Sequence, residues 1–517
     1  MSYVAPRQLL LVRILALLLN GFLALRIAWV SDDALITLRT ALNITHGWGA
    51  GFNSTEAVQA YTHPLWFLLW IFIGNLSNQW IMGILILSVI LTLTAVGVLL
   101  WRIRSLPRLI IAVALLAFSN AFMDYSTSGL ENPLAYALVS VLLALTFVRE
   151  WTWRTALLTG LASAAIFLTR FDLALLIAPA LLVIAWSLRA KWRLLLIGLG
   201  SVVVPVVIWF IWSKATYGVL LPNTFEAKRN LAISATDLAS QGLMYLWVSF
   251  GHDPASLIAV LLGVVMSLVI GSRVHRAWAI GVLLYLIYVV QIGGDFMSGR
   301  FIAVPVLVCV FLLSTVQTPV SASTQVAEND QRGLILTGVA LTGVTFLLAG
   351  AVAMGDTPGS LQTLTGPRFY EFNIADERGH YSPGRNLSLM LRQTFNKYEE
   401  APKSGDLYSL NVAANTWATK EPGVDYAVTT PTPTYCLFAG TALIEGPLVQ
   451  EVDPCGLTDR VTASVTYTPD KQFMWRMGHF LRPLPPGYLN AIATRDVSLI
   501  EDPELRERVA QLWREIR

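Results

Sequence analysis

The sequence contains few charged residues. Only 13% of its 517 residues are charged and 55% are hydrophobic, whereas a soluble globular protein carries about 25% charged residues. A soluble core of that size would still need a charged shell, so lipid is expected to be part of the solvent. The formal net charge of +3 is too small to indicate nucleic-acid binding. The composition therefore predicts an integral membrane protein.

Metal-ligand clusters and nucleotide-binding loops are also lacking. The 6 histidines and 3 cysteines show no metal-ligand spacing, and no phosphate-cradling glycine loop occurs. We therefore expect no metal, no cofactor and no nucleotide-sugar donor. Cys436 and Cys455 lie in the polar C-terminal region and are candidates for a disulfide if that region is exported. Two unpaired thiols are the alternative.

Long apolar runs are what the chain has in abundance. A run of about 17–25 residues crosses the hydrocarbon layer, and spans interrupted by motif residues look shorter. The first run lacks a small-residue cleavage site, so we interpret it as a retained span. About eleven spans are predicted in this way. They are residues 9–30, 80–101, 109–122, 133–148, 156–168, 173–188, 194–212, 256–270, 277–292, 302–316 and 334–353.

Basic residues recur in alternate loops, which the positive-inside rule assigns to the cytoplasm. The alternation holds only if the apolar segment 63–74 lies at the interface or re-enters the membrane; a kinked crossing is the alternative. The basic positions are Arg7 and the stretches 102–108, 149–154, 189–193 and 273–276. The opposite, outer loops are then 31–79, 124–132, 169–172, 214–254 and 293–301.

The chain changes character after the last predicted span. Residues 355–517 are polar, rich in Pro, Gly and Thr, and contain no further run of spanning length. We expect residues 1–354 to form a polytopic α-helical membrane domain and residues 355–517 a soluble periplasmic α/β or α+β domain. The alternating segments 426–430 and 461–467 predict strands, and the charged segment 503–516 predicts a helix.

An acidic pair, Asp32 and Asp33, closes the first span at the outer face. Two adjacent carboxylates disfavour double ionisation, so one can hold a raised pKa while the other acts as a base or stabilises an oxocarbenium-like transition state. Capping of the following helix is the alternative role for Asp32. The other outer loops mix carboxylates and guanidinium groups, which suits an anionic leaving group and an acceptor hydroxyl. The pair is the predicted catalytic centre.

The motifs of the outer loops resemble a known family. The pair is followed by HGWGAGFN at 46–53 and by YTHP at 61–64. These stretches resemble polyprenyl-phosphate-dependent glycosyltransferases of the GT-C fold, and most closely the mycobacterial terminal β-(1→2)-arabinofuranosyltransferases. The chain is short for that family, which leaves the acceptor open. Similar motifs are SGLENP at 128–133, TRFD at 169–172, PNTF at 222–225, GGDFM at 293–297, DER at 376–378, GLTD at 456–459, RMGHF at 476–480 and PPGY at 485–488.

The resemblance implies a membrane enzyme that transfers arabinofuranose from a decaprenyl-phosphoryl donor to a glycan on the outer side of the bacterial plasma membrane. Cationic side chains suit the donor phosphate, and Arg170 either binds it or only pairs with Asp172. The phosphate candidates are His63, Arg170, Lys228, Arg229 and Arg300. The sugar or acceptor candidates are Glu131, Asp172, Asn223, Asp295 and His479.

Simpler roles compete with several of these assignments. Glu131 and Asp295 are as well explained by charges at helix ends as by sugar ligands. For His479 with its neighbouring arginines, surface charge is the alternative to an acceptor contact. Two other functions also compete. One is a GT-C transferase of another sugar acting on protein, glycan or lipid A. The other is a transporter, which would show internal repeats and mid-span charges; the sequence shows no repeat, and its charges gather at one face.

Overall fold

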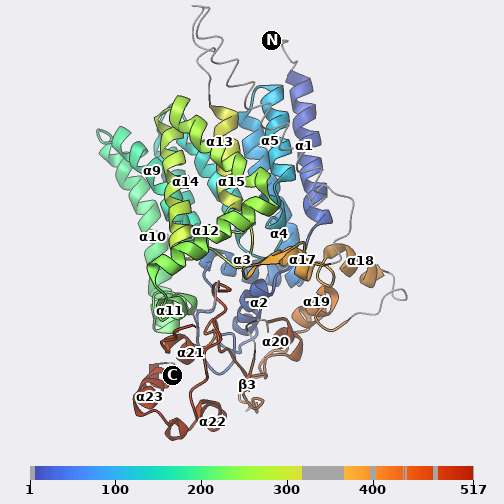
Figure 1. The fold of residues 1–517 in the computed structure, drawn as a ribbon, viewed down its shortest axis with the longest axis vertical. Coiled ribbons are helices and arrows are strands. Elements are labelled where there is room, and N and C mark those ends of the chain that lie inside the picture. Colours follow the sequence, from blue (N-terminus) through green and yellow to red (C-terminus); the bar gives the residue numbers. More distant parts are fainter. Residues whose placement is uncertain are drawn as a thin grey trace, which may run out of the picture.

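The computed structural model describes residues 6–316, 366–395, 403–424, 426–434, 436, 439–469 and 475–515. A bundle of helices forms one end of the molecule, and the tail, residues 366–515, covers the other end (Figure 1). The helices before the tail are α1 (Pro6–Arg26), α2 (Asp32–Thr45), α3 (Pro64–Ser77), α4 (Trp80–Arg102), α5 (Leu106–Phe118), α6 (Asn120–Asp124), α7 (Asn132–Thr146), α8 (Trp153–Thr169), α9 (Leu173–Ser187), α10 (Trp192–Tyr217), α11 (Asn223–Arg229), α12 (Ala235–His252), α13 (Pro254–Ile270), α14 (Arg273–Gln291) and α15 (Ala303–Thr315).

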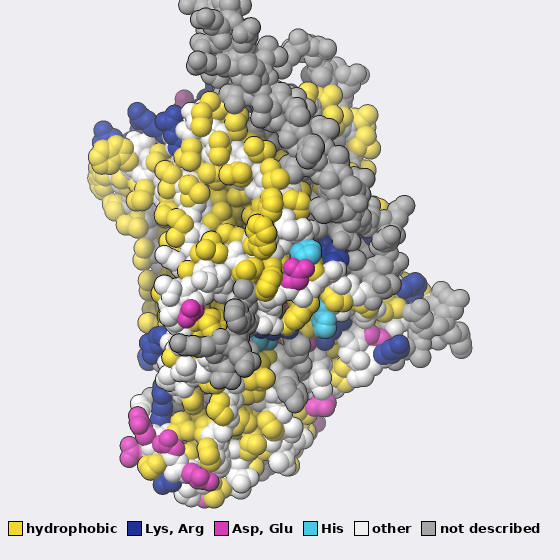
Figure 2. All heavy atoms as spheres, in the orientation of Figure 1, with side chains coloured by type: hydrophobic (Ala, Val, Ile, Leu, Met, Phe, Trp, Pro, Cys, Tyr) yellow, Lys and Arg dark blue, Asp and Glu magenta, His cyan; other side chains and the backbone are white. Residues whose placement is uncertain are grey.

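Within the described part of the chain, four helices are long and apolar enough to cross a membrane: α1, α4, α10 and α14. The pair α12 and α13, bent by 111° at its junction, adds a fifth span if it is counted as one. Hydrophobic side chains cover much of the visible face of the bundle, as expected where lipid is the solvent (Figure 2). The chain is therefore a multi-spanning membrane protein.

The spans predicted from the sequence agree with the structure in position and not in length. Each predicted span coincides with helix, except 334–353, which lies outside the described residues. The count of about eleven spans is not confirmed within the described residues, because most of these helices have only 13 to 17 residues and fall short of the usual spanning length. The predicted outer loop 214–254 is largely helical, since it contains α11 and the whole of α12. In α12 polar residues interrupt the apolar ones and hide the helix from a search for apolar runs.

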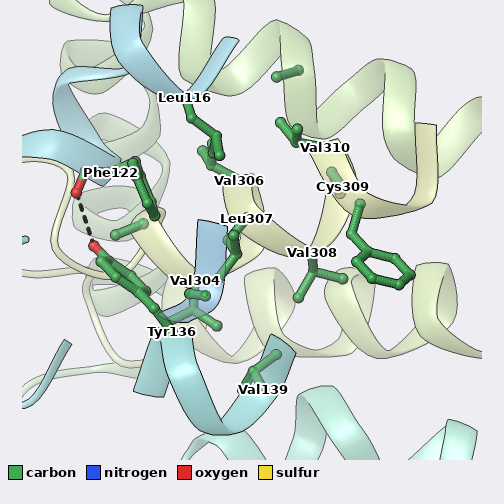
Figure 3. Packing of buried hydrophobic residues seen from close by; sticks show 14 of the residues in the cluster. Leu116, Phe122, Tyr136, Val139, Val304, Val306, Leu307, Val308, Cys309 and Val310 are labelled. Atoms are coloured by element: carbon green, nitrogen blue, oxygen red, sulfur yellow. Dashed lines mark hydrogen bonds between the residues drawn. The ribbon is translucent and has the colours of Figure 1, made fainter. Parts of the chain in front are cut away.

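The main core lies inside the bundle and is centred on α15. This helix is apolar on all sides and almost fully buried, as expected for a helix surrounded by other helices. Figure 3 shows Val304, Val306 and Val308 of α15 packed with Val139 of α7 and its neighbours. The hydroxyl of Tyr136 donates to the carbonyl of Phe122 at 3.2 Å, so the one polar atom of that ring is satisfied within the core.

A second core joins the first outer loop to the tail. Helices α2 and α3 share one hydrophobic cluster with the tail helices α19 (Leu407–Asn415) and α20 (Ala439–Glu445). At its centre Arg39 is fully buried, and its guanidinium donates to the carbonyls of Phe52 at 2.9 Å, of Val449 at 2.8 Å and of Ala442. A buried charge is tolerated only when it is satisfied in this way. The tail is thus packed onto the membrane domain through a common core.

The tail is mostly helix and irregular chain with two very short sheets. Antiparallel β1 and β2 form one, and parallel β3 and β4 form the other. The predicted boundary between residues 354 and 355 lies outside the described residues. The tail elements are β1 (Tyr370–Glu371), β2 (Ile374–Ala375), α17 (Glu377–Tyr381), α18 (Leu387–Phe395), α19 (Leu407–Asn415), β3 (Thr432–Pro433), α20 (Ala439–Glu445), β4 (Glu451–Val452), α21 (Arg460–Ser464), α22 (Tyr488–Thr494), the 3₁₀ helix η2 (Val497–Leu499) and α23 (Pro503–Glu515).

Two strand predictions in the tail were wrong, and one helix prediction is confirmed. Residues 426–430, all of them described, form no strand, and the short β3 begins just after them. Residues 461–467 begin inside α21 instead of a strand, because Asp459 caps a helix there through the Thr462 amide at 2.8 Å. The charged C-terminal segment forms α23 as predicted. Cys436 and Cys455 form a disulfide in the structure, with their Cα atoms 5.9 Å apart.

Candidate active site

A cavity of about 590 Å³ lies between the helix bundle and the tail. One part of its wall is apolar and comes mainly from α8–α11, including Phe167, Phe171, Leu175, Phe210 and Phe225. The other part is charged. It is made by Asp33, His63, Glu131, Arg170, Asp172, Lys228, Asp295 and Arg300, with His479 from the tail. Among the predicted site residues, all of them described, Asp32, Asn223 and Arg229 do not line this cavity.

Helix α2 carries the acidic pair, and its start is fixed by the loop that precedes α7. Ser31 is the N-cap, since its hydroxyl accepts from the Ala34 amide at 3.3 Å, and Asp32 therefore does not have that role. Gly129 lies against the same turn with φ +77°, and a Cβ there would come within 2.8 Å of the Cβ of Ala34. Only glycine fits this contact. Local packing thus fixes the directions of both aspartates.

Asp32 faces the tail. Its carboxylate accepts from the guanidinium of Arg385 at 3.0 Å and from the backbone amides of Ala439 at 3.1 Å and Gly440 at 3.2 Å. These three partners all belong to the tail, and the carboxylate is nearly buried among them. A carboxylate satisfied by an arginine and two amides is well suited to hold a segment in place. Asp32 is therefore an anchor between α2 and the tail.

Asp33 faces the cavity and has much looser contacts. Its nearest charged partner is Nη1 of Arg300, which lies 3.8 Å from Oδ2, and its side chain is 24% exposed. Burial raises the pKa of Asp33 to about 6; Arg300 opposes this rise, while Asp295 and Asp32 add to it. A carboxylate with a pKa near 6 is ionised at neutral pH and still basic enough to accept a proton.

Arg300 is shared by several carboxylates of the cavity. Its Nη1 contacts Asp295 at 3.6 Å as well as Asp33, and its Nη2 contacts Glu131 at 3.4 Å. Burial raises the pKa of Asp295, although Arg300 and Lys228 oppose the rise. The guanidinium of Arg300 thus contacts three carboxylates, those of Asp33, Glu131 and Asp295. Its single positive charge neutralises each of them only in part.

Glu131 is the most strongly compensated acid of the cavity. Besides Arg300, its carboxylate contacts Nδ1 of His63 at 3.2 Å and Nε of Arg170 at 3.8 Å. Burial would raise its pKa, but Arg300, His63 and Arg170 outweigh burial and hold the pKa of Glu131 well below its usual range. The other ring nitrogen of His63 is hydrogen-bonded to Thr37 at 2.8 Å. Glu131 and His63 therefore serve first to neutralise and orient their neighbours.

Arg170 pairs with Asp172 and still faces the cavity. Its guanidinium donates to both carboxylate oxygens of Asp172, at 3.2 and 2.5 Å, and to the hydroxyl of Tyr285 at 2.8 Å. Tyr285 was missed by sequence analysis because it lies within an apolar spanning run. The Nη1 atom of Arg170 is buried and has no hydrogen-bond partner in the described chain. That atom is available to an anionic ligand.

The predicted site residues of the 214–254 segment, the phosphate candidates Lys228 and Arg229 and the sugar candidate Asn223, lie in different environments. Lys228 lines the cavity and has no ion-pair partner among the described residues. Arg229 is turned outward, with its side chain 64% exposed, and pairs with Glu226 at 3.0 Å. The amide of Asn223 donates to the carbonyls of Gly456 at 2.8 Å and Asp459 at 3.0 Å, so Asn223 joins α11 to the tail. Neither Arg229 nor Asn223 reaches the cavity.

The tail contributes more to the site than the sequence indicated. His479 lines the cavity, and Arg482 is buried with its guanidinium on backbone carbonyls, so the interpretation of this group as surface charge was wrong. Arg476 pairs with Glu377 at 3.0 Å. Burial raises the pKa of Glu377 to about 8, an effect opposed by Arg476 and strengthened by Asp33 and Asp295. Glu377 was noted only as part of a motif and not as a site residue.

A second charged cluster joins the tail to α6 through close ion pairs. Arg368 contacts Asp124 at 2.6 Å and Asp376 at 2.7 Å, and Arg378 contacts Asp124 at 2.5 Å. The side chains are almost completely buried, and the arginines come from the tail while Asp124 ends α6. Close, satisfied pairs of this kind fix structure and leave little capacity for a ligand.

One group in the described chain has its donor atoms close enough for a metal ion: Cys436, Asp453 and Cys455. The two sulfurs are joined in the disulfide, so they are not thiolate ligands. The carboxylate of Asp453 already accepts from the amides of Cys455, Leu457 and Thr458. Asp453 therefore stabilises the turn at residues 453–458, and the three side chains are close together for that structural reason.

Comparison with known proteins supports the resemblance found in the motifs. No protein-family model matches the chain. The chain is 28% identical over 402 residues to the terminal β-(1→2)-arabinofuranosyltransferase of Mycobacterium tuberculosis, which covers 68% of this chain and 62% of that protein. It is 26% identical over 366 residues to the enzyme of the same name from Corynebacterium glutamicum, covering 60% of this chain and 52% of that protein. The predicted resemblance is confirmed.

These relatives are longer proteins, since the matched regions span 62% and 52% of their lengths. Among solved structures, the chain is similar to the crystal structure of ArnT from Cupriavidus metallidurans bound to undecaprenyl phosphate. That similarity has a TM-score of 0.42 and 15% sequence identity, and it covers 67% of this chain and 66% of that one.

Proposed function

We propose that this protein is a membrane glycosyltransferase of the GT-C type, which transfers arabinofuranose from a decaprenyl-phosphoryl donor to a glycan acceptor in the cell envelope. One observation carries the proposal. A single cavity joins an apolar wall made by membrane helices to a charged wall that contains a weakly paired carboxylate, Asp33. A lipid-linked sugar phosphate needs both kinds of wall. The similarity to terminal arabinofuranosyltransferases supports the choice of sugar.

The donor occupies the side of the cavity that is next to the lipid. Its polyprenyl chain lies along the aromatic wall of Phe167, Phe171 and Phe210, where apolar burial favours it. Its phosphate lies between Lys228 and the unbonded Nη1 of Arg170, because these cationic groups have capacity left. Arg300 and His63 are less available, since carboxylates already hold them. They stabilise the negative charge of the site instead.

Asp33 is the catalytic carboxylate in this mechanism. It takes the proton of the acceptor hydroxyl while the acceptor oxygen bonds to the anomeric carbon. The bond between that carbon and the phosphate oxygen breaks, and the polyprenyl phosphate leaves with the negative charge beside Lys228 and Arg170. The negative charge of Asp33 also favours the oxocarbenium character of the transition state. Asp295 is next to Asp33 on Arg300 and is positioned to bind a sugar hydroxyl.

The reaction takes place on the outer side of the plasma membrane. The loop between α9 and α10 carries Arg189 and Lys191, and Arg193 lies in the first turn of α10. Basic side chains gather at this end of the bundle in Figure 2. The tail lies toward the other end (Figure 1), and its residues Met477 and His479 line the cavity. The positive-inside rule therefore supports an outward-facing cavity and tail.

The test is transfer by the purified full-length protein in lipid nanodiscs. Decaprenyl phosphate carrying arabinofuranose, mannose or 4-aminoarabinose is offered with a synthetic arabinofuranose oligosaccharide, and the product is analysed by mass spectrometry and NMR. We expect transfer from the arabinofuranose donor only, and the anomeric configuration of the product reports inversion or retention. Transfer of another sugar would overturn the choice of arabinose. No transfer from any of the three donors would overturn the enzyme class.

A further inference from the structure

The tail places one side chain in the cavity with its hydrogen-bonding capacity unused. Both ring nitrogens of His479 are shielded from solvent, and neither makes a hydrogen bond of standard geometry within the described residues, although the Met477 backbone lies close enough to raise the pKa of the ring. Burial lowers the pKa of His479 to about 3, and Arg476 lowers it further, so the ring is neutral at physiological pH. A neutral imidazole offers one donor and one acceptor. Leaving both unmade costs free energy, which a ligand in the cavity can recover.

The ring of His479 packs on Phe296, which Arg476 contacts as well. The imidazole packs edge-on against Phe296, with ring centres 4.2 Å apart and an interplanar angle of 70°. The guanidinium of Arg476 lies 4.5 Å from the same phenyl ring, and Arg476 is fixed in turn by the buried carboxylate of Glu377 at 3.0 Å. Phe296 directly follows the cavity residue Asp295. The ring of His479 is thereby aimed from the tail at the charged wall.

The loop that carries Phe296 fits closely against the tail segment that carries His479. Gly293 has φ +85°, and a Cβ at this position would lie 2.9 Å from both the sulfur and the methyl carbon of Met477. The loop and the segment therefore touch directly two residues before His479. This contact fixes the position of the tail segment 477–479 against the loop that carries Asp295 and Phe296.

We infer that His479 is a specificity-determining residue that hydrogen-bonds a hydroxyl of the acceptor sugar, and that Glu377 and Arg476 are positioning residues that hold it on Phe296. The inference rests on the proposed function. A sugar hydroxyl donates and accepts at once, as a neutral imidazole does. The acceptor is chosen over the donor because His479 comes from the tail, whereas the aromatic wall proposed for the polyprenyl chain comes from the membrane helices. A water-soluble glycan approaches from the tail side.

The test measures the KM values for the two substrates separately. The donor is decaprenyl-phosphoryl arabinofuranose and the acceptor is the synthetic arabinofuranose oligosaccharide. His479→Phe should raise the acceptor KM about 5–10-fold, because the hydrogen bonds to the sugar are lost, and should change the donor KM less than about twofold. His479→Asn keeps a donor and an acceptor and should restore part of the acceptor affinity. A purely structural role would not give this rescue.

Arg476→Ala tests the positioning role. It should raise the acceptor KM in the same direction as His479→Phe, and the double variant should be no worse than the more affected single variant, since both act through one ring. Arg508→Ala is the matched control. That arginine also lies in the tail, where it donates to the Ser464 carbonyl at 3.1 Å, and its loss should leave both KM values unchanged.

The outcomes separate the two proposals. An unchanged acceptor KM in folded His479→Phe, or an equal rise in both KM values, would overturn the acceptor contact. Fully additive effects of Arg476→Ala and His479→Phe would overturn the positioning role. If the wild-type protein transfers no sugar from the donor, the proposed function fails and the inference falls with it. Wild-type transfer with unaffected variants overturns the inference alone.

Discussion

The first turn of α2 presents two adjacent carboxylates to two different regions of the molecule. Toward the tail, Asp32 is held by Arg385 and by two backbone amides at 3.0 to 3.2 Å. Toward the cavity, Asp33 has one charged neighbour at 3.8 Å and a pKa that burial raises to about 6. The same chemical group is thus an anchor in one region and the proposed base in the other. The difference lies in how completely its partners satisfy it.

The same difference in pairing separates the two charged clusters, one between the tail and the bundle and one in the cavity. The cluster of Arg368, Arg378, Asp124 and Asp376 is closely paired and joins the tail to the bundle. In the cavity, by contrast, Arg300 is shared among three acids at 3.4 to 3.8 Å. Incomplete pairing leaves charge available to a substrate, and it costs stability that the closed cluster helps to restore. The following predictions test this contrast.

The largest expected effect is the loss of turnover in Asp33→Asn. Removal of the proposed base should reduce kcat by about 10²–10⁴-fold, because an amide cannot accept the proton of the acceptor hydroxyl. Donor binding should remain within about twofold of the wild type, since the proposed phosphate ligands Lys228 and Arg170 are unchanged. Equilibrium binding of radiolabelled donor, measured beside the transfer rate, checks both parts. A loss of donor binding equal to the loss of rate would contradict the assigned role.

Thermal stability should change in opposite directions in the two aspartate variants. Asp32→Asn weakens a buried, hydrogen-bonded ion pair and should lower stability by about 1–3 kcal/mol. Asp33 has a folded-state pKa above its unfolded value of 3.8, so its contribution to stability is full below that value and is lost as pH rises through about 6. Asp33→Asn removes this loss and should raise stability by up to about 3 kcal/mol at pH 7.5 and by little at pH 4.

Unfolding followed by intrinsic fluorescence at the two pH values measures these changes. Melting temperatures that fall in both variants at pH 7.5 would show that Asp33 is also an anchor. A gain for Asp33→Asn that persists at pH 4 would exclude its titration as the cause.

Adjacent cations give a smaller contrast of the same kind. Lys228→Gln should raise the donor KM about 10-fold or more, because a charged hydrogen bond to the phosphate is lost. Arg229→Gln is the matched control and should change it less than about twofold, since that side chain is exposed and pairs only with Glu226 in the described chain. Steady-state kinetics with varied donor tests the pair. Equal effects in both variants would contradict the geometry.

The smallest expected effect is a shift in the pH profile. The rate should fall on the acid side with an apparent pKa near 6, as Asp33 becomes protonated. Asp295 raises the pKa of Asp33, so Asp295→Asn should move this acid limb to lower pH by about one unit or less. The limb is measured from kcat/KM between pH 4.5 and 8. A shift to higher pH would show that Asp295 is not a source of the raised pKa.

The sequence predicted the membrane character, the positions of most bundle helices and the charged residues of the cavity, because these depend on apolar runs and on charges at the ends of those runs. It could not decide between Asp32 and Asp33. Successive residues on a helix point about 100° apart, so their surroundings differ even though they are neighbours in the chain. The main partner of Asp32, Arg385, lies 353 positions away, and no local pattern reveals it.

The same limit explains the errors outside the pair. Lys228 and Arg229 look equivalent in the sequence, and only the direction of α11 separates them. Tyr285 is hidden in an apolar spanning helix, and Glu377 acts through Arg476, 99 positions later. Residues 461–464 form helix α21 in place of the expected strand, because Asp459 caps a helix there. Side-chain direction and long-range contacts are what the sequence alone did not supply.

The division of roles within the acidic pair is tested most directly by the transfer rates of Asp32→Asn and Asp33→Asn. Both variants and the wild type are assayed at pH 7.5 with decaprenyl-phosphoryl arabinofuranose and the oligosaccharide acceptor, and rates are normalised to folded protein. We predict that Asp32→Asn keeps a rate within about 10-fold of the wild type, while Asp33→Asn loses at least about 100-fold. The reverse order, or full activity in Asp33→Asn, would contradict the assignment of Asp33 as the catalytic base.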